Sequence, residues 1–376
     1  MSRMRIYKKS FVSLMIIIET ACVFAGCSLP SEKKADSIQE TTEIHNAPEQ
    51  IRRDSVGMYI YSQLDAAEQD CYDKIYTGFM VQNSEIDVSE YSNKTIQDIY
   101  EDIRAEHAEI FWVNGYELNT TDYNGGKTSK LMIPNYIRRV SDIALAKKGI
   151  EQVADSLKNE VSGMNAYDKS KYLYTWICNN TSYKSGEKDQ DIRSVFIDKE
   201  SVCQGYASAY QYLLNRYGIK SFVVRGIHGD DLHAWVAAKI GDSWYYSDPT
   251  LGDAEFQSKN GQETFVDYSY FNMTEDECAK THYSLSNISL PNGDNKWNSY
   301  FYRERLYFSV FAPDQVCERI QEEYAKNDYI ILKFGSKEER RKAEVELFDE
   351  QLLSEYIEVP NVIYLTSGDK LIIFKQ

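Results

Sequence analysis

The sequence predicts an α+β fold with a central core, an N-terminal α+β region and a small C-terminal two-layer α/β module. Apolar residues recur at helical spacing in 166–180 and 206–217, which predicts two amphipathic helices. Residues 233–250 alternate on both sides of a Gly-Asp pair, which predicts a β-hairpin. The 376 residues, 43 % of them hydrophobic, can bury more than one core.

The first 26 residues have the layout of an export signal. A basic stretch (MSRMRIYKK) precedes an apolar run (FVSLMIII) and the small residues before Cys27. This arrangement resembles the lipobox of bacterial lipoproteins, which implies that Cys27 is lipidated and anchors an extracytoplasmic protein to the bacterial cell membrane. Phe24 stands where that pattern prefers Leu, so ordinary cleavage after Ala25 and an uncleaved anchor are alternatives.

Residues 27–50 are predicted to be a disordered tether, because 28–50 contain no aromatic residue and are rich in Ser, Glu and Thr. Residues 51–159 follow as the N-terminal region. Its predicted elements are a helix over 66–78 capped by Asp65 and Glu68, a helix from Thr95 to Glu106, and strands over 110–113 and 131–133.

Nucleotide and nucleic acid are excluded as ligands. The GGKT at 125–128 suggests a phosphate loop, but Thr121 stands where that loop requires Gly. The net charge of −16 would repel a phosphate backbone. We also expect no metal and no cofactor, because DQD at 189–191 lacks the rest of a calcium loop and no C-x-x-C spacing occurs.

The helix predicted over 166–180 offers Cys178 to a core as a packing residue. The next helix begins in SVCQGYA at 201–207. Ser201 is a good N-cap with Gln204 at capping-box spacing, which places Cys203 second in a helix that Gly218 ends. A helix start favours a negative sulfur, and the N–H of Cys203 would be free to bind an oxyanion. A buried structural cysteine is the alternative interpretation.

The predicted hairpin brings a histidine and a carboxylate together. With Gly241-Asp242 as the turn, Ile240 pairs with Ser243, and His233 then lies one diagonal step from Asp248 on the same face. His228, in a glycine-flanked loop, is the rival histidine. The opposite face is predicted to be the core side and consists of Ala234, Val236, Ala238 and Ile240.

A thiol at a helix start, an imidazole and a carboxylate are the parts of a cysteine acyl-transfer site. His233 would take the Cys203 proton, and Asp248 would orient the imidazole. The candidate substrate-lining residues are Gln204, Trp235 and Tyr246.

At these residues the chain resembles the transglutaminase-like superfamily, through SVCQGYA at 201–207, HAW at 233–235 and SDPTLGD at 247–253. The resemblance implies a permuted papain-like core over about 160–290, a Cys203-His233-Asp248 triad and a thioester intermediate. The preceding YSQLDAAEQDCYDKIY and AEIFWVNGY are similar to the leader of bacterial lipoproteins in this superfamily.

Residues 299–376 are predicted to be the C-terminal α/β module. The expected elements are a strand in YFYRERLYFSV, a helix from Pro313, a strand in YIILKFG, a helix capped by Ser336 and Glu339, and a closing hairpin around Ser367-Gly368. No constellation of chemically active residues occurs in it, so we expect a binding or packing role.

Two functions follow from these patterns. The first is a surface-anchored enzyme that acts on peptide amides, with cell-wall peptides or surface proteins as substrates. Hydrolysis is favoured over cross-linking because no dedicated amine site is recognisable. The second is a non-catalytic peptide- or cell-wall-binding module on the same fold. The sequence carries no pattern that specifies an oligomeric state.

Overall fold

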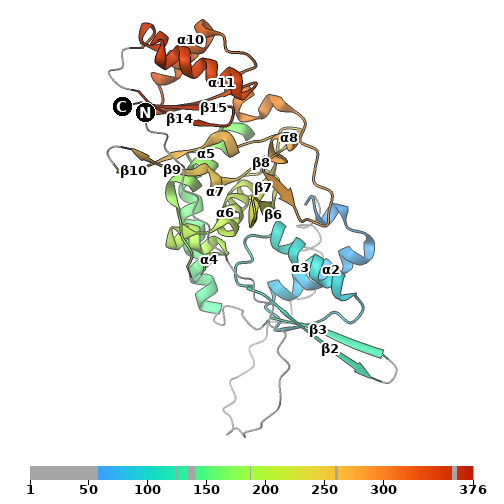
Figure 1. The fold of residues 1–376 in the computed structure, drawn as a ribbon. Coiled ribbons are helices and arrows are strands. Elements are labelled where there is room, and N and C mark those ends of the chain that lie inside the picture. Colours follow the sequence, from blue (N-terminus) through green and yellow to red (C-terminus); the bar gives the residue numbers. More distant parts are fainter. Residues whose placement is uncertain are drawn as a thin grey trace.

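The computed structural model describes residues 58–123, 126–133, 140–186, 188–258, 261–357 and 362–375 (Figure 1). The predicted signal, tether and lipidation site at Cys27 lie outside these ranges. Among the described helices, none is long and apolar enough to cross a membrane. Helices and strands are mixed along the described chain, as the predicted α+β class requires.

A four-stranded antiparallel sheet lies at the centre, in the order β11-β6-β7-β8. Its strands are β6 (Ser221–His228), β7 (Asp231–Ile240), β8 (Ser243–Ser247) and β11 (His282–Ser284). Ile240 pairs with Ser243, which confirms the predicted hairpin register and its turn at Gly241-Asp242. The sheet register therefore fixes which side chains of β7 face each side.

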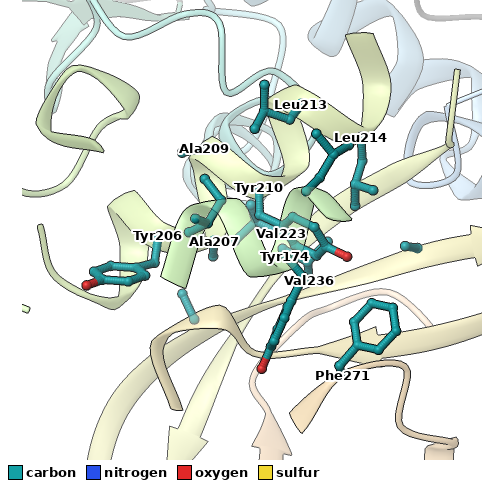
Figure 2. Close-up of a cluster of buried hydrophobic side chains, with 14 of the residues drawn as sticks. Tyr174, Tyr206, Ala207, Ala209, Tyr210, Leu213, Leu214, Val223, Val236 and Phe271 are labelled. Carbon is teal, nitrogen blue, oxygen red and sulfur yellow. The ribbon is translucent and has the colours of Figure 1, made fainter. Parts of the chain in front are cut away.

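Helix α6 (Cys203–Arg216) packs on one face of this sheet. Figure 2 shows Tyr210 and Leu214 of α6 close to Val223 of β6 and Val236 of β7. The predicted core side of β7 is buried: Ala234, Val236, Ala238 and Ile240 are each at most 2 % exposed. Helix α5 (Ala166–Asn180), which has the predicted bounds, packs against α6.

The N-terminal region combines helices with a small sheet in the order β1-β3-β2. Its elements are the 3-10 helix η1 (Tyr61–Gln63), α2 (Ala66–Met80), β1 (Glu85–Asp87), α3 (Asn93–Glu106), β2 (Glu117–Tyr123), β3 (Gly126–Met132) and α4 (Val140–Ser156). The predicted capping box of Asp65 and Glu68 is formed. The strand predicted over 110–113 is wrong, because this apolar run is a buried turn.

Short elements connect the helices to the central sheet. They are β4 (Ser182–Tyr183), the π-helix η2 (Ser194–Asp198), β5 (Glu200–Ser201), α7 (Pro249–Gly252), β9 (Asp253–Ser258), β10 (Gly261–Val266), the 3-10 helix η3 (Tyr268–Tyr270), α8 (Glu275–Cys278) and the 3-10 helix η4 (Lys296–Asn298). β4 pairs in parallel with β5, directly before α6, and β9 pairs with β10.

The C-terminal elements build a second four-stranded sheet in the order β12-β13-β15-β14, with α10 and α11 above it in Figure 1. They are α9 (Tyr300–Arg303), β12 (Tyr307–Phe308), α10 (Pro313–Tyr324), β13 (Tyr329–Phe334), α11 (Lys337–Glu344), η5 (Val345–Asp349), η6 (Leu352–Glu355), β14 (Ile363–Ser367) and β15 (Lys370–Phe374). The segment predicted as a strand at the start of this region begins with the short helix α9, and only Tyr307–Phe308 form a strand, β12. The closing turn lies one residue later than predicted, at Gly368-Asp369.

The C-terminal sheet packs directly on the preceding hairpin. The ring of Phe374 stacks on Phe256 at a centroid distance of 4.3 Å and meets Phe265 at 5.3 Å. The hydroxyl of Tyr329 donates to the carbonyl of Val266 at 2.9 Å. One cluster of buried side chains therefore runs from Tyr61 to Phe374.

Candidate active site

Cys203 is the first residue of α6 and is partly exposed, whereas the other four cysteines of the described ranges are buried. Burial raises the pKa of Cys71 to about 12 and that of Cys317 to about 11, which keeps those thiols neutral at physiological pH. Among the described cysteines, Cys203 is thus the one placed to meet a ligand.

The predicted cap at Ser201 is wrong. The N-cap of α6 is Val202, and Ser201 lies in β5 with its hydroxyl hydrogen-bonded to the Ser194 hydroxyl at 2.6 Å and the Asp189 carbonyl at 3.0 Å. Because Ser201 pairs in β5 and its hydroxyl bonds to Ser194 of η2, the side chain cannot cap α6. Cys203 is consequently the first helical residue instead of the second.

The first turn of α6 is packed tightly against β5. The first helical hydrogen bond runs from the N–H of Tyr206 to the carbonyl of Val202, so three earlier N–H groups precede the helical ladder. A Cβ added at Gly205 would lie 2.0 Å from the hydroxyl of Ser201 and 2.7 Å from the carbonyl of Asp189. Only glycine allows this approach, which ties the first turn of α6 to β5.

The hairpin brings His233 and Asp248 together as its register predicts. Nε2 of His233 lies 2.6 Å from Oδ2 of Asp248, and the two side chains are 10 % and 0 % exposed. Asp248 follows the end of β8 and is the N-cap of α7, where its Oδ1 accepts the backbone N–H groups of Thr250 and Leu251 at 2.9 and 3.2 Å. Helix α7 therefore fixes one oxygen of the carboxylate and leaves the other for imidazole.

The charges of His233 and Asp248 stabilise each other. Burial lowers the pKa of His233, but the Asp248 carboxylate and Cys203 outweigh it and raise that pKa to about 10. Burial likewise raises the pKa of Asp248, and the hydrogen bonds and charges of His233 and His282 reverse this, so the pKa lies below its ordinary value. The buried imidazole is held as a cation between a carboxylate and the Cys203 side chain.

A second histidine, which the sequence analysis missed, reaches the same carboxylate. Nε2 of His282 lies 3.1 Å from Oδ2 of Asp248, and neither side chain is exposed. His282 starts β11, a three-residue strand with no recognisable pattern of its own, so its place follows only from the pairing of β11 with β6. Within the described ranges, His233, Asp248 and His282 form a cluster whose potential metal-ligating atoms lie within 4.8 Å of one another. Hydrogen bonds already join both histidines to the carboxylate.

His228 also lies in this neighbourhood. It is the last residue of β6 and pairs with His282, so the prediction that it sits in a loop outside the strands is wrong. Its ring centroid is 5.5 Å from that of His233 and 5.0 Å from that of His282. Three imidazoles thus gather at this end of the sheet, and two of them contact the Asp248 carboxylate.

Two predicted substrate-lining residues are core residues. Trp235 and Tyr246 are each 1 % exposed, because the face of the sheet that carries them is covered by a second apolar cluster. The members of that cluster are Ile60, Ala105, Phe222, Val224, Trp235, Ala237, Tyr246, Met273 and Cys278. Gly226 makes room for the Trp235 ring, since a Cβ there would lie 2.6 Å from it. Gln204 remains partly exposed, and its amide donates to the hydroxyl of Ser208.

Tyr183 is an exposed aromatic residue near Cys203 that the sequence analysis did not single out. It ends β4, is 49 % exposed and lies 6.3 Å from the ring of Tyr206. Burial and the neighbouring Cys203 raise the pKa of its hydroxyl to about 12. Two-residue strands carry too little alternation to be recognised in a sequence, which hid its position.

Part of the chain matches a known protein family. Residues 155–249 match the family model described as the transglutaminase-like superfamily. This range contains Cys203, His233 and Asp248 and ends before His282. No curated protein matches the chain.

Several solved structures are distantly similar. A TGase is 16 % identical with a TM-score of 0.28, over 38 % of this chain and 47 % of that one, so this chain spans about half of its length. A candidate cysteine protease from Cytophaga hutchinsonii is 16 % identical with a TM-score of 0.26, over 48 % and 80 %. The periplasmic domain of TgpA from Pseudomonas aeruginosa is 20 % identical with a TM-score of 0.22, over 33 % and 55 %. The predicted resemblance is confirmed where the family model matches, over residues 155–249.

Proposed function

We propose that this chain is a cysteine acyl-transfer enzyme that acts on peptide amide bonds, with Cys203 as nucleophile, His233 as base and acid, and Asp248 as the residue that orients the imidazole. One observation carries the proposal: a buried imidazole bonded to Asp248 at 2.6 Å interacts with the partly exposed thiol at the start of α6. The other described cysteines are buried.

The first half of the reaction forms a thioester. The proton that Cys203 gives up resides on His233, which Asp248 holds as an imidazolium, and the sulfur attacks the carbonyl carbon of the amide. The N–H of Cys203, at the helix start, is placed to donate to the resulting oxyanion. When the C–N bond breaks, the leaving amine takes the proton from His233, and the acyl group stays on sulfur.

The second half releases the acyl group. His233 removes a proton from water, the hydroxide oxygen attacks the thioester carbonyl, and the C–S bond breaks to give a carboxylic acid and the thiol. An amine in place of water would give a new amide. We favour hydrolysis because the described residues around Cys203 offer the aromatic Tyr183 but no recognisable site for a second, amine substrate.

Peptides of the cell wall or of surface proteins are the substrates we propose, together with an extracytoplasmic location through a lipid on Cys27. The location is tested by metabolic labelling with a fatty-acid analogue: incorporation into the wild type and none into Cys27→Ala is expected. Equal labelling of both, or labelling of neither, contradicts the anchor.

The activity is tested by incubating the protein with a peptide library in ¹⁸O-labelled water and analysing the products by mass spectrometry. We expect cleaved peptides that carry one ¹⁸O, and a loss of at least about a thousandfold in rate for Cys203→Ala and His233→Ala. Cys317→Ala, which removes a buried thiol from α10, is the control and should retain the rate. Binding of peptides without turnover by the wild type would instead identify a non-catalytic module.

A further inference from the structure

We propose that His282 is a positioning residue of this site: from β11, it holds the Asp248 carboxylate that orients the His233 imidazole. The proposal rests on the proposed function. His282 lies beyond residue 249, where the family-model match ends, and no sequence motif singles it out.

The hydrogen bonds of Asp248 carry the inference. A carboxylate offers about four acceptor positions, two on each oxygen. Oδ1 accepts the N–H groups of Thr250 and Leu251, and Oδ2 accepts Nε2 of His233 at 2.6 Å and Nε2 of His282 at 3.1 Å. All four positions are filled although the side chain is 0 % exposed. Without His282, one acceptor position of a buried anion would lack a donor, which is costly.

The surroundings of His282 make it a donor to Asp248. Its Nδ1 lies 2.9 Å from the hydroxyl of Thr281, which can donate to it and leave the ring proton on Nε2. The ring is fully buried, and the Trp235 ring meets it edge-on at 4.8 Å. With both nitrogens bonded and one ring face packed, the imidazole is held in the orientation that Asp248 requires.

The sheet explains how a residue so far along the chain reaches the triad. His233 pairs with Gly226 of β6, and Gly226 pairs with Ser284 of β11. His233 and His282 consequently project from the same face of the sheet, on either side of a strand position without a side chain. A Cβ at Gly226 would lie 2.0 Å from the carbonyl of Tyr283 and 2.6 Å from Trp235. The glycine brings β11 close enough for His282 to reach Asp248.

The test is the rate of iodoacetamide labelling at Cys203 between pH 5 and pH 9 in the full chain. His282→Leu removes the donor, and His282→Gln keeps an N–H near the position of Nε2. If His282 positions Asp248, labelling at pH 6 falls roughly ten- to a hundredfold in His282→Leu, the profile moves toward that of a free thiol, and His282→Gln restores most of the rate. Equal profiles for wild type and His282→Leu overturn the proposal.

A matched control variant measures the general effect of losing a buried imidazole elsewhere in the protein. His107 is 2 % exposed, and its Nδ1 lies 2.7 Å from a carboxylate oxygen of Glu109, in the N-terminal region. His107→Leu should leave the labelling profile of Cys203 unchanged. An equal shift in both Leu variants would mean that His282 acts only on stability, which also overturns the positioning role.

A second readout separates this proposal from the proposed function. In ¹⁵N-histidine-labelled protein, the Nε2–H of His233 bonded to Asp248 should give a low-field proton resonance that shifts or broadens in His282→Leu and returns in His282→Gln. This resonance does not depend on turnover. An enzyme without peptide activity could still show it, whereas an unchanged resonance in His282→Leu contradicts the role of His282 even in an active enzyme.

Discussion

At the scale of single residues, Asp248 is the centre of the site because its charge is stabilised from three elements. The start of α7 supplies two backbone N–H groups, β7 supplies His233 and β11 supplies His282. A buried carboxylate with a lowered pKa and a buried imidazole with a raised pKa stabilise each other in the folded state. The same pair must therefore make the stability of the protein depend on pH.

The sign of that dependence follows from the two shifts. The pKa of His233 rises from 6.5 to about 10 on folding, so its contribution is complete below pH 6.5 and is lost as the pH rises toward 10. The pKa of Asp248 falls below 3.8, so its contribution is present above pH 3.8 and is lost only in stronger acid. Urea unfolding of wild type and His233→Gln should give a stability difference that shrinks between pH 6.5 and pH 10. A difference that stays constant over this range contradicts the ion pair.

Residue positions were predictable from the sequence where they depend on local patterns. The turn at Gly241-Asp242 fixes the register, and the register brings His233 to Asp248. The place of His282 in the site was not predictable, because β11 has only three residues and its pairing with β6 depends on the tertiary fold. Trp235 was assigned to the wrong environment for a similar reason: the segments that cover its face are distant in sequence.

At the scale of elements, the start of α6 shows how a helix terminus can be placed by packing instead of by a cap. The sequence predicted the helix and its end near Gly218, but Ser201 is taken by β5 and η2, and Val202 provides no side-chain cap. The contact of Gly205 with Ser201, Ser194 and Asp189 does the positioning. The position of the Cys203 sulfur thus depends on the fit of this first turn.

Gly205→Ala tests this dependence. The added methyl group meets atoms at 2.0 and 2.7 Å, so we expect a destabilisation of about 1–3 kcal/mol and slower labelling of Cys203 by iodoacetamide. Gly149→Ala in α4 is the matched control, since its Cβ would lie 3.7 Å from Ile197. It should stabilise the protein by about 0.5–1 kcal/mol without changing the labelling rate. Thermal unfolding and labelling kinetics measure both effects, and unchanged labelling in Gly205→Ala contradicts the fixed first turn.

At the scale of the whole molecule, the predicted regions share one apolar cluster instead of meeting at polar linkers. Phe374 at the C-terminal end packs on Phe256 and Phe265, and Glu304 accepts hydrogen bonds from Tyr167 and Lys171 of α5, each at 2.8 Å. Most element types were predictable from periodicity and turn residues, with the strand predicted over 110–113 an exception. These contacts join segments more than a hundred residues apart and leave no local pattern. The C-terminal region thus packs directly on the β9–β10 hairpin and on α5.

The first described residues of the chain, which pack against the central sheet, have a mechanical consequence. Tyr59 stacks on Phe222 of β6 at 5.3 Å, and the N–H of Ile60 donates to the buried Glu106 at 2.7 Å. A pulling force applied to the chain before Met58 would reach these two residues first, and through Phe222 it would load β6. That strand lies between the one that carries His233 and the one that carries His282. A pull on the chain before Met58 would therefore be transmitted to the strand that lies between the two histidine-bearing strands.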